Sequence, residues 1–311
     1  MKLLVVGGSR FVGRHWVEAA MAAGHTVTLF NRGQSGAAPA GVEQRLGDRR
    51  KDLSALGQDQ WDAVVDTCGY LPGEVQTMAA CLRGRVGRYL LISSISAYAD
   101  ATTTNPETAP LGQFDKPEDA QTHVVDGASY GPLKALCEAL CEAQVQAAFG
   151  DDGLILRPGL IVGPHDPTQR FTCWPARIAR AAPDEPVLAP GPAEAAVQFI
   201  DARDLAAFML TLLARPAGAE HRHFLAVDNH RAVAAGLVTR PLADTVADTL
   251  AWYRRLPTAL QTFDKAGLTP EREAMALEQI LLAHLAQPPR AADDPSPRPG
   301  GTPDDLATVE G

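Results

Sequence analysis

The chain has 311 residues, of which 46% are hydrophobic, so it is long enough to bury the core of one large or two modest globular domains. Its formal net charge of −9 gives no electrostatic footprint for nucleic acid or an anionic membrane surface, and we expect neither as a partner. No apolar run reaches about 18 residues and no signal-like segment precedes the first apolar run, so we expect a cytoplasmic protein without a membrane span.

The N-terminal segment has the pattern of a strand, a glycine turn and a helix. Leu3 to Val6 are apolar, the glycine-rich segment 7–13 follows, and apolar residues then recur at helical spacing. Glycines in such a turn let the backbone approach a pyrophosphate, and the next helix offers free N–H groups to the anion. We therefore predict a dinucleotide-binding turn, in which the cofactor contacts are Gly7, Ser9, Arg10, Phe11, Val12 and Gly13.

The predicted second strand, residues 26–30, ends at Asn31 and Arg32. The first unit of a dinucleotide fold places at this point the side chain that reads the ribose, and an acid there favours NAD. Arg32, with Arg10 as a second cation, suits a 2′-phosphate instead. We assign Asn31 and Arg32 to the cofactor site and predict NADP(H), with NAD as the alternative. Arg32 could also be a solvated loop arginine.

Further apolar runs at 63–66, 89–92 and 153–156 alternate with helix-like segments at 73–83 and 132–148. Runs that are apolar on both faces suit strands buried in a parallel sheet between helices. The sequence therefore predicts a doubly wound α/β fold of the Rossmann type.

Tyr130 and Lys134 place a phenol and an ammonium one helical turn apart. The positive charge favours the phenolate, so the phenol can exchange a proton with a substrate oxygen near neutral pH. Alone, this spacing is more often a surface helix pair. Ser94, after the predicted fifth strand, offers a hydroxyl to the same oxygen, whereas Ser93 and Ser96 are expected to bond to the local backbone.

Several short motifs, taken together, resemble the extended short-chain dehydrogenase/reductase family, in its atypical NAD(P)-dependent epimerase/dehydratase branch. The resemblance implies Ser94, Tyr130 and Lys134 as catalytic residues, of which Tyr130 and Lys134 also contact the cofactor. It further implies that Asp48 contacts the adenine, that Thr67 and Cys68 line the cofactor groove, and that Pro158 to Leu160 lie near the nicotinamide. The carrying segments are 7–13, 47–48, 93–98, 130–134, 157–164 and 199–205.

Two features depart from the family pattern. Arg10 replaces the middle glycine of the turn. In addition, the segment 223–226 nearly abuts 228–237, where relatives insert several tens of residues of a substrate domain. The resemblance therefore implies a shortened substrate subdomain, whose site is open, completed by a second copy in a homodimer, or catalytically impaired.

The domain organisation follows from these segments. We expect residues 1–158 and 198–228 to form the dinucleotide-binding domain, 159–197 and 229–285 a small C-terminal substrate subdomain, and 286–311 a disordered tail rich in Pro, Gly and Asp. The five cysteines lack metal-ligand spacing, so we predict no metal.

The sequence thus predicts an NADP(H)-dependent oxidoreductase or epimerase-type enzyme that acts on a small carbonyl or hydroxyl compound, such as a sugar nucleotide or a secondary metabolite. The alternative is a dinucleotide-binding sensor, scaffold or RNA-binding relative without catalysis.

Overall fold

A computed structural model describes residues 1–100, 103, 105–149, 153–192, 194, 197–215, 223–224, 228–263 and 266–285. The predicted tail, 286–311, lies outside these residues. None of the helices in the described ranges combines the length and apolar character that a membrane span requires.

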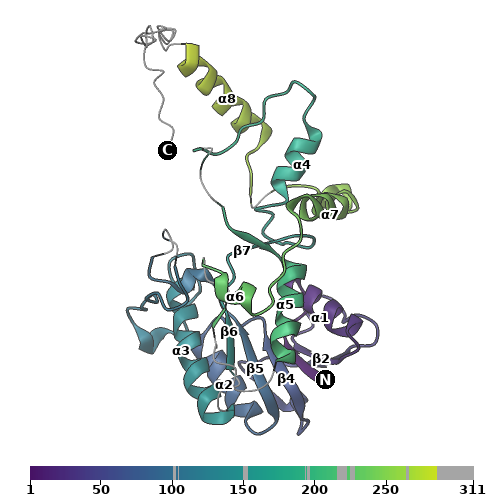
Figure 1. Ribbon diagram of the computed structural model, residues 1–311, viewed down its shortest axis with the longest axis vertical. Helices are drawn as coiled ribbons and strands as arrows, with labels where there is room; N and C mark the ends of the chain where they lie inside the picture. The colour runs from purple at the N-terminus through teal and green to yellow at the C-terminus, as the bar shows by residue number, and fades with distance from the viewer. Residues whose placement is uncertain are drawn as a thin grey trace, which may run out of the picture.

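A parallel seven-stranded sheet forms the centre of the lower body in Figure 1. Its strand order is β3-β2-β1-β4-β5-β6-β9, which contains the 3-2-1-4-5-6 order of the dinucleotide-binding fold. This confirms the predicted doubly wound fold. The strands are β1 (Lys2–Val6), β2 (Thr26–Asn31), β3 (Glu43–Leu46), β4 (Trp61–Asp66), β5 (Val86–Ile92), β6 (Gly153–Leu156) and β9 (His223–Phe224).

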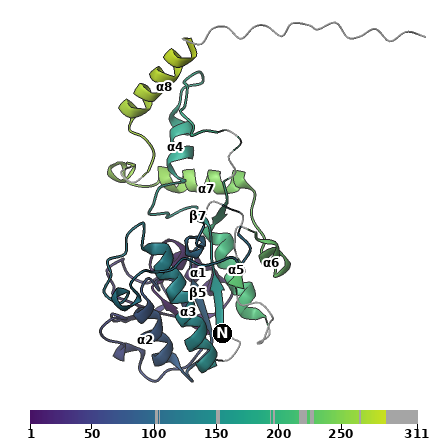
Figure 2. The same cartoon turned by 90° about the vertical axis from the view of Figure 1, so that its left-hand side faces the viewer.

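Helices cover both faces of this sheet. α1 (Phe11–Ala22) and α5 (Ala202–Ala214) pack together on one face, and α2 (Pro72–Leu82) and α3 (Tyr130–Phe149) pack together on the other (Figures 1 and 2). Each face has its own apolar core. Trp16 of α1 and Phe208 of α5 belong to the first core, and Met78 of α2 and Tyr89 of β5 to the second.

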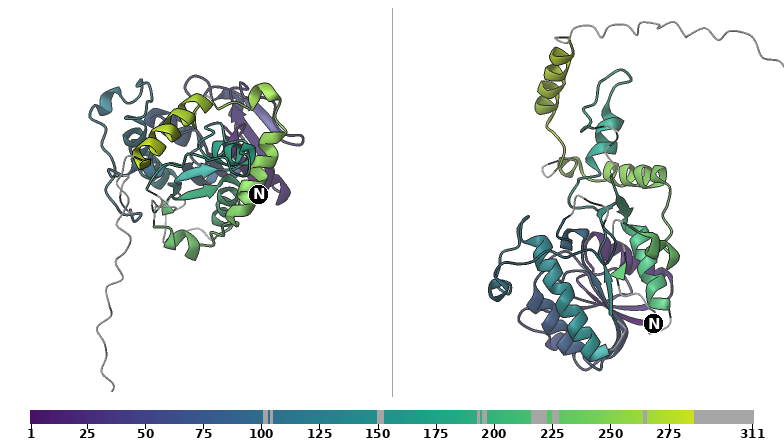
Figure 3. Two further views of the ribbon diagram at one scale, coloured as in Figure 1. Left: turned by 90° about the horizontal axis from the view of Figure 1, so that it is seen from above. Right: turned by 60° about the vertical axis from the view of Figure 1, so that its left-hand side comes forward.

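Most of the remaining elements lie above the carboxyl edge of the sheet, as the right-hand view of Figure 3 shows, whereas α6 (His230–Ala234) contributes Ala232 to the first core. A two-stranded parallel sheet begins this region. Asp201 caps α5 by accepting the N–H of Arg203. The elements are β7 (Leu160–Val162), β8 (Phe199–Asp201), α4 (Cys173–Arg180), α6 (His230–Ala234), α7 (Leu242–Arg254) and α8 (Pro270–Leu285). Short 3₁₀ turns are η1 (Ser54–Leu56), η2 (Ile95–Ala97), η3 (Pro117–Asp119) and η4 (Thr258–Leu260).

Among the elements that the sequence analysis did not predict are β3 and α7. β3 is an edge strand whose residues are half-buried or exposed, so it lacks the apolar run that marks the central strands. α7 buries Thr245, Thr249 and Tyr253, two of which are polar, so its apolar periodicity is weak.

Candidate functional site

The glycine turn between β1 and α1 has a shape that only small residues allow. Gly7 and Gly8 have φ angles of +97° and +79°, in the left-handed region that favours glycine. A Cβ atom on Gly13 would lie 2.6 Å from the Cα of Gly8, so the first turn of α1 rests directly on the glycine backbone. These residues fit a dinucleotide, because the missing side chains leave the backbone N–H groups at the start of α1 open to a pyrophosphate. Ser9, Arg10, Phe11 and Val12 complete the turn and remain partly or fully exposed.

Two polar side chains hold this turn in place. The Thr67 hydroxyl donates to the carbonyl of Val6 at 2.9 Å and accepts the N–H of Gly8 at 3.4 Å. The amide of Asn31 donates to the carbonyl of Gly7 and to the hydroxyl of Ser9, at 3.1 and 2.9 Å. Its oxygen accepts two more hydrogen bonds. Asn31 therefore braces the turn with its whole amide group.

Arg32 differs from Asn31 in being exposed, and it has no hydrogen bond or ion pair with the described residues. Asp48 is half-buried on the loop after β3, where one carboxylate oxygen accepts the N–H of Arg50 at 3.0 Å. The other carboxylate oxygen of Asp48 does not take part in this hydrogen bond. Both side chains follow strands at the same sheet edge as the glycine turn, on the β2–β3 side.

A buried ion pair lies beneath this edge. Arg49 donates to both carboxylate oxygens of Asp66 at 2.8 and 2.7 Å, and the hydroxyl of Tyr89 donates to the same carboxylate at 2.6 Å. Burial opposes ionisation of Asp66, but the charge and hydrogen bonds of Arg49 hold its pKa below the ordinary value. The sequence reasoning missed this pair. Cys68 donates its backbone N–H to Asp66, and burial raises the pKa of its thiol to about 11, so the thiol stays protonated.

Lys134 reaches from α3 to the carboxyl ends of β4 and β5. Its side chain is 2% exposed, and its ammonium donates to the carbonyls of Gly69 and Ile92, each at 2.9 Å. The ammonium also lies 4.9 Å from the ring centroid of Tyr70 and 5.9 Å from that of Tyr130. The structure thus brings Tyr130 and Lys134 together, and adds Tyr70, which the sequence reasoning did not single out.

Ser94 lies at the start of η2, against which α3 packs. Its hydroxyl accepts the N–H of Ser96 and donates to the Ser96 hydroxyl, both at 3.1 Å. A Cβ atom on Gly131, the residue after Tyr130, would lie 2.0 Å from the carbonyl oxygen of Ser96. Gly131 therefore permits the close approach of the Tyr130 helix to the Ser94 turn. A glycine directly after the tyrosine is the feature of the sequence that could have predicted this approach.

Arg157 connects α3 to the segments around Tyr98 and Glu107, next to the Ser94 turn. Its guanidinium donates to Glu138 of α3 at 2.8 and 2.6 Å, to the Tyr98 hydroxyl at 3.3 Å and to the carbonyl of Glu107 at 2.7 Å. Next along the chain, Pro158 accepts the N–H of Ile95 at 3.1 Å, and half-buried Leu160 opens β7. The segment 158–160 therefore runs beside the Ser94 turn.

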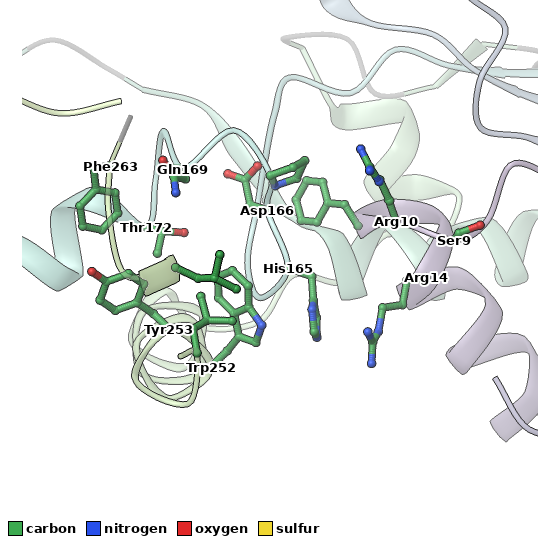
Figure 4. A pocket seen from close by; sticks show the side chains of 14 residues that line it. Ser9, Arg10, Arg14, His165, Asp166, Gln169, Thr172, Trp252, Tyr253 and Phe263 are labelled. Carbon is green, nitrogen blue, oxygen red and sulfur yellow. The ribbon is translucent and has the colours of Figure 1, made fainter. Parts of the chain in front are cut away.

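A pocket of 320 Å³ opens beside the glycine turn (Figure 4). The glycine turn, the loop after β7 and α7 line it, and none of Ser94, Tyr130 and Lys134 does. Within the described ranges, no group of three His, Cys, Asp or Glu side chains is placed to hold a metal ion.

Several aromatic and arginine side chains of the C-terminal region have structural partners. Phe171 packs against Phe199 with ring centroids 5.8 Å apart, and Arg170 donates to the Thr168 hydroxyl. Arg177 forms ion pairs with Glu185 and Glu273. Trp174 is 37% exposed.

Comparisons with known proteins agree with this geometry. The family described as "NAD dependent epimerase/dehydratase family" matches residues 3–227. The 2′-dehydrokanamycin reductase of Streptomyces kanamyceticus is 31% identical over 292 residues, which cover 89% of this chain and 72% of that protein. The chloroplast stem-loop binding protein of 41 kDa b of Arabidopsis thaliana is 28% identical over 163 residues, or 42% of this chain and 43% of that protein.

Among solved structures, the UDP-glucuronic acid 4-epimerase of Bacillus cereus, in complex with NAD, superposes with a TM-score of 0.66 at 15% identity, over 86% of this chain and 100% of that chain. MoeE5 in complex with UDP-glucuronic acid and NAD gives a TM-score of 0.62 at 18% identity, over 82% and 99%. At these identities the likeness shows the fold alone. The family match over more than half of the chain confirms the resemblance found in the sequence motifs. The chain belongs to the NAD-dependent epimerase/dehydratase family, whose members are NAD(P)-dependent enzymes of the oxidoreductase, epimerase and dehydratase type within the extended short-chain dehydrogenase/reductases.

Proposed function

We propose that this protein is an NADP(H)-dependent oxidoreductase or epimerase-type enzyme that uses Tyr130 and Lys134 to move a proton on a small carbonyl or hydroxyl substrate. The observation that carries the proposal is the anchoring of Lys134, whose buried ammonium bonds to two backbone carbonyls at the sheet edge. An ammonium has three N–H donors, so one remains for a ribose hydroxyl of the cofactor.

The chemistry divides between cofactor and protein. When bound, a nicotinamide cofactor supplies or accepts the hydride at the substrate carbon. Tyr130 exchanges a proton with the substrate oxygen at its phenol, and the Lys134 ammonium lies 5.9 Å from the centroid of its ring. Ser94 orients the same oxygen by exchanging its hydrogen bond to exposed Ser96 for one to the substrate.

A preference for NADP(H) rests on exposed Arg32. Its guanidinium has no partner among the described residues, so it is available to a 2′-phosphate, with Arg10 in the glycine turn as the second cation. An acidic residue at the end of β2 favours NAD, and this chain has Asn31 at that position.

The proposed substrates are modified sugars, either in secondary metabolites or as sugar nucleotides. The related reductase of Streptomyces kanamyceticus is named for 2′-dehydrokanamycin. One similar fold was solved with UDP-glucuronic acid, and another is a UDP-glucuronic acid 4-epimerase. We also propose that a second copy packs on α8, because Met275, Ile280, Leu281 and Leu282 are exposed there.

The decisive experiment compares two phenols that share one lysine. Tyr130→Phe should abolish turnover, measured by nicotinamide fluorescence with a panel of sugar carbonyls, and should leave cofactor affinity and folding unchanged. Tyr70→Phe is the matched control. Partial burial of Tyr70, which remains 44% exposed, raises its pKa to about 12, so it is a poor proton donor and the variant should retain turnover. Full activity of Tyr130→Phe, or loss of activity in Tyr70→Phe alone, would overturn the assignment.

A second candidate function is suggested by the stem-loop binding protein among the relatives. In that case the chain would bind a dinucleotide or RNA without catalysis. The net charge of −9 opposes RNA binding. Cofactor binding without turnover across the whole substrate panel, together with a shift of a labelled RNA hairpin in a gel, would favour this alternative.

A further inference from the structure

The pocket beside the glycine turn has a cationic end, an aromatic end and unused polar atoms between them. It lies where three segments that are far apart in sequence meet: the start of α1, the loop after β7, and α7 with the turn that follows it (Figure 4). The lining residues are Ser9, Arg10, Phe11, Arg14, His165, Asp166, Pro167, Gln169, Thr172, Trp252, Tyr253, Leu256, Leu260 and Phe263.

The cationic end is formed by Arg10 and Arg14, at the right of Figure 4. Arg14 donates its Nε to Glu18 at 2.8 Å, which leaves its two terminal nitrogens without a partner in the described part of the chain. The side chain of Arg10 likewise has no hydrogen bond or ion pair to a described residue. Asp166 is the only carboxylate among the described lining residues, and it is held by the N–H and hydroxyl of Thr168. The pocket therefore favours an anion.

The second observation is a buried hydroxyl without a partner. Thr172 is 1% exposed, and its Oγ1 forms no hydrogen bond although it precedes α4, where a threonine hydroxyl commonly caps the helix. In Figure 4 this hydroxyl points toward the middle of the pocket. The side-chain oxygen of Gln169 is also buried without a partner. A buried polar atom that lacks a partner costs free energy, which a ligand with hydroxyl or N–H groups recovers.

Backbone strain is concentrated on the same loop. His165 and Gln169 have φ angles of +69° and +61°, in a region that non-glycine residues seldom adopt. Such strain clusters at binding sites, where surrounding contacts hold the backbone in place. Here the ring of His165 is held between those of His15 and Trp252, with centroids 5.7 and 5.2 Å away.

The aromatic end lies opposite the arginines. Tyr253 and Phe263 stack with ring centroids 5.2 Å apart and planes at 19°, and the Tyr253 hydroxyl donates to the carbonyl of Gln261. Trp252 completes this end beside His165. Aromatic walls of this kind accept the flat or apolar face of a ring.

We propose that this pocket binds a small phosphate ester of a hydroxyl-bearing ring compound, with the phosphate at Arg14, a ring hydroxyl or N–H at Thr172, and the ring against Trp252. Nucleoside monophosphates and sugar phosphates share this chemistry. The site does not depend on the function proposed above, because Ser94, Tyr130 and Lys134 do not line it. It is an accessory ligand site at the junction of the two parts of the chain.

Calorimetric titration of the full chain without cofactor tests the site. The probes are uridine 5′-monophosphate, glucose 6-phosphate, glucose and inorganic phosphate. We expect at least one of the two phosphate esters to bind more tightly than inorganic phosphate, and we expect glucose not to bind. The ester that binds more tightly shows whether the ligand is a nucleoside monophosphate or a sugar phosphate. Failure of both esters to bind overturns the proposal.

Variants locate the binding. Arg14→Gln should weaken the ester about tenfold or more, because a charge-assisted hydrogen bond is lost. Arg255→Gln, which removes an equal charge from outside the lining, should have no effect. Thr172→Val should weaken binding, whereas Thr172→Ser, which keeps the hydroxyl, should retain it and shows that the fold is intact. Equal losses in both arginine variants would mean unspecific charge attraction and would contradict the proposal.

The last arm separates the pocket from the cofactor groove. Saturating NADPH should leave the ester affinity of the wild-type protein unchanged within about twofold, since Arg14, Thr172 and Trp252 line the pocket and are not among the proposed cofactor contacts. Abolished binding under saturating NADPH would show that Arg14 serves the dinucleotide, and would refute a separate site whatever the outcome of the activity assays.

Discussion

Arg49 and Asp66 form a bidentate ion pair in the interior, with N–O distances of 2.8 and 2.7 Å and side chains that are 8% and 0% exposed. Arg49 directly follows Asp48 on the loop after β3, and Asp66 directly precedes Thr67 at the end of β4. The pair therefore links the segment of Asp48, the predicted adenine contact, to the segment of Thr67, which is predicted to line the cofactor groove. The Tyr89 hydroxyl donates a further hydrogen bond to the Asp66 carboxylate, and Arg49 donates one to the carbonyl of Glu74.

Removing one partner of this pair should be costly. Arg49→Met leaves the Asp66 carboxylate buried without its counter-ion, and we expect the free energy of unfolding to fall by about 3–5 kcal/mol. Urea unfolding at neutral pH measures the change. Lys51→Met, on the exposed part of the same loop, should change the unfolding free energy by no more than about 0.5 kcal/mol. A similar small effect for Arg49→Met would show that the pair is not a net contributor to stability.

Gly131→Ala should separate turnover from folding. The added Cβ would lie 2.0 Å from the backbone oxygen of Ser96, so α3 or the Ser94 turn must move. We expect turnover to fall about 100-fold, because a displacement of about 1 Å between catalytic groups has this effect, with a loss of unfolding free energy of about 1–3 kcal/mol.

Gly127→Ala is the matched control for that substitution. A Cβ on Gly127 meets no atom within 4 Å, and the residue lies just before the same helix. Steady-state turnover and thermal unfolding of the two variants give the comparison. Normal turnover in Gly131→Ala would mean that the close approach of helix and turn is not required for activity.

The sequence predicted the central strands well because their residues are buried on both faces. Leu3, Val65 and Leu90 are each completely buried, and such runs leave a continuous apolar signal. The edge strand β3 carries Glu43 and Arg45, whose exposure removes that signal. The order of the strands came from the family pattern of motifs, since single runs do not encode their neighbours.

The hydrogen-bond partners of the candidate site residues were harder to predict than the identity of those residues. Lys134 donates to the backbone carbonyls of Gly69 and Ile92, and a carbonyl acceptor leaves no mark on residue type. Arg49 and Asp66 are 17 positions apart, and only the parallel pairing of strands brings them together. The pocket joins residues as distant as Arg14 and Trp252, so no local pattern announces it.

His165 should make the protein sensitive to mild acid. Burial, followed by the positive charges of Arg14 and His15, lowers the pKa of His165 from 6.5 to about 4. Between these pH values the unfolded chain binds a proton at this residue and the folded chain does not. The free energy of unfolding therefore falls as the pH drops through this window.

His165→Asn tests that dependence without breaking the loop. Asparagine tolerates the φ of +69° better than most residues and does not titrate. Urea unfolding at about pH 7 and about pH 5 should show a smaller loss of stability for the variant than for the wild-type protein. An equal loss in both proteins would assign the acid sensitivity to other groups.

Cofactor selectivity should depend on Arg32. If its unpartnered guanidinium meets the 2′-phosphate, Arg32→Gln removes a charge-assisted hydrogen bond to NADPH but leaves contacts to NADH intact. We expect kcat/KM for NADPH to fall about tenfold or more, with kcat/KM for NADH nearly unchanged. Arg83→Gln, an exposed arginine after α2, should alter neither value and controls for the change in net charge. Because the ratio compares two cofactors in one variant, a general loss of folding cancels, and an unchanged ratio would show that selectivity lies elsewhere on the adenine side.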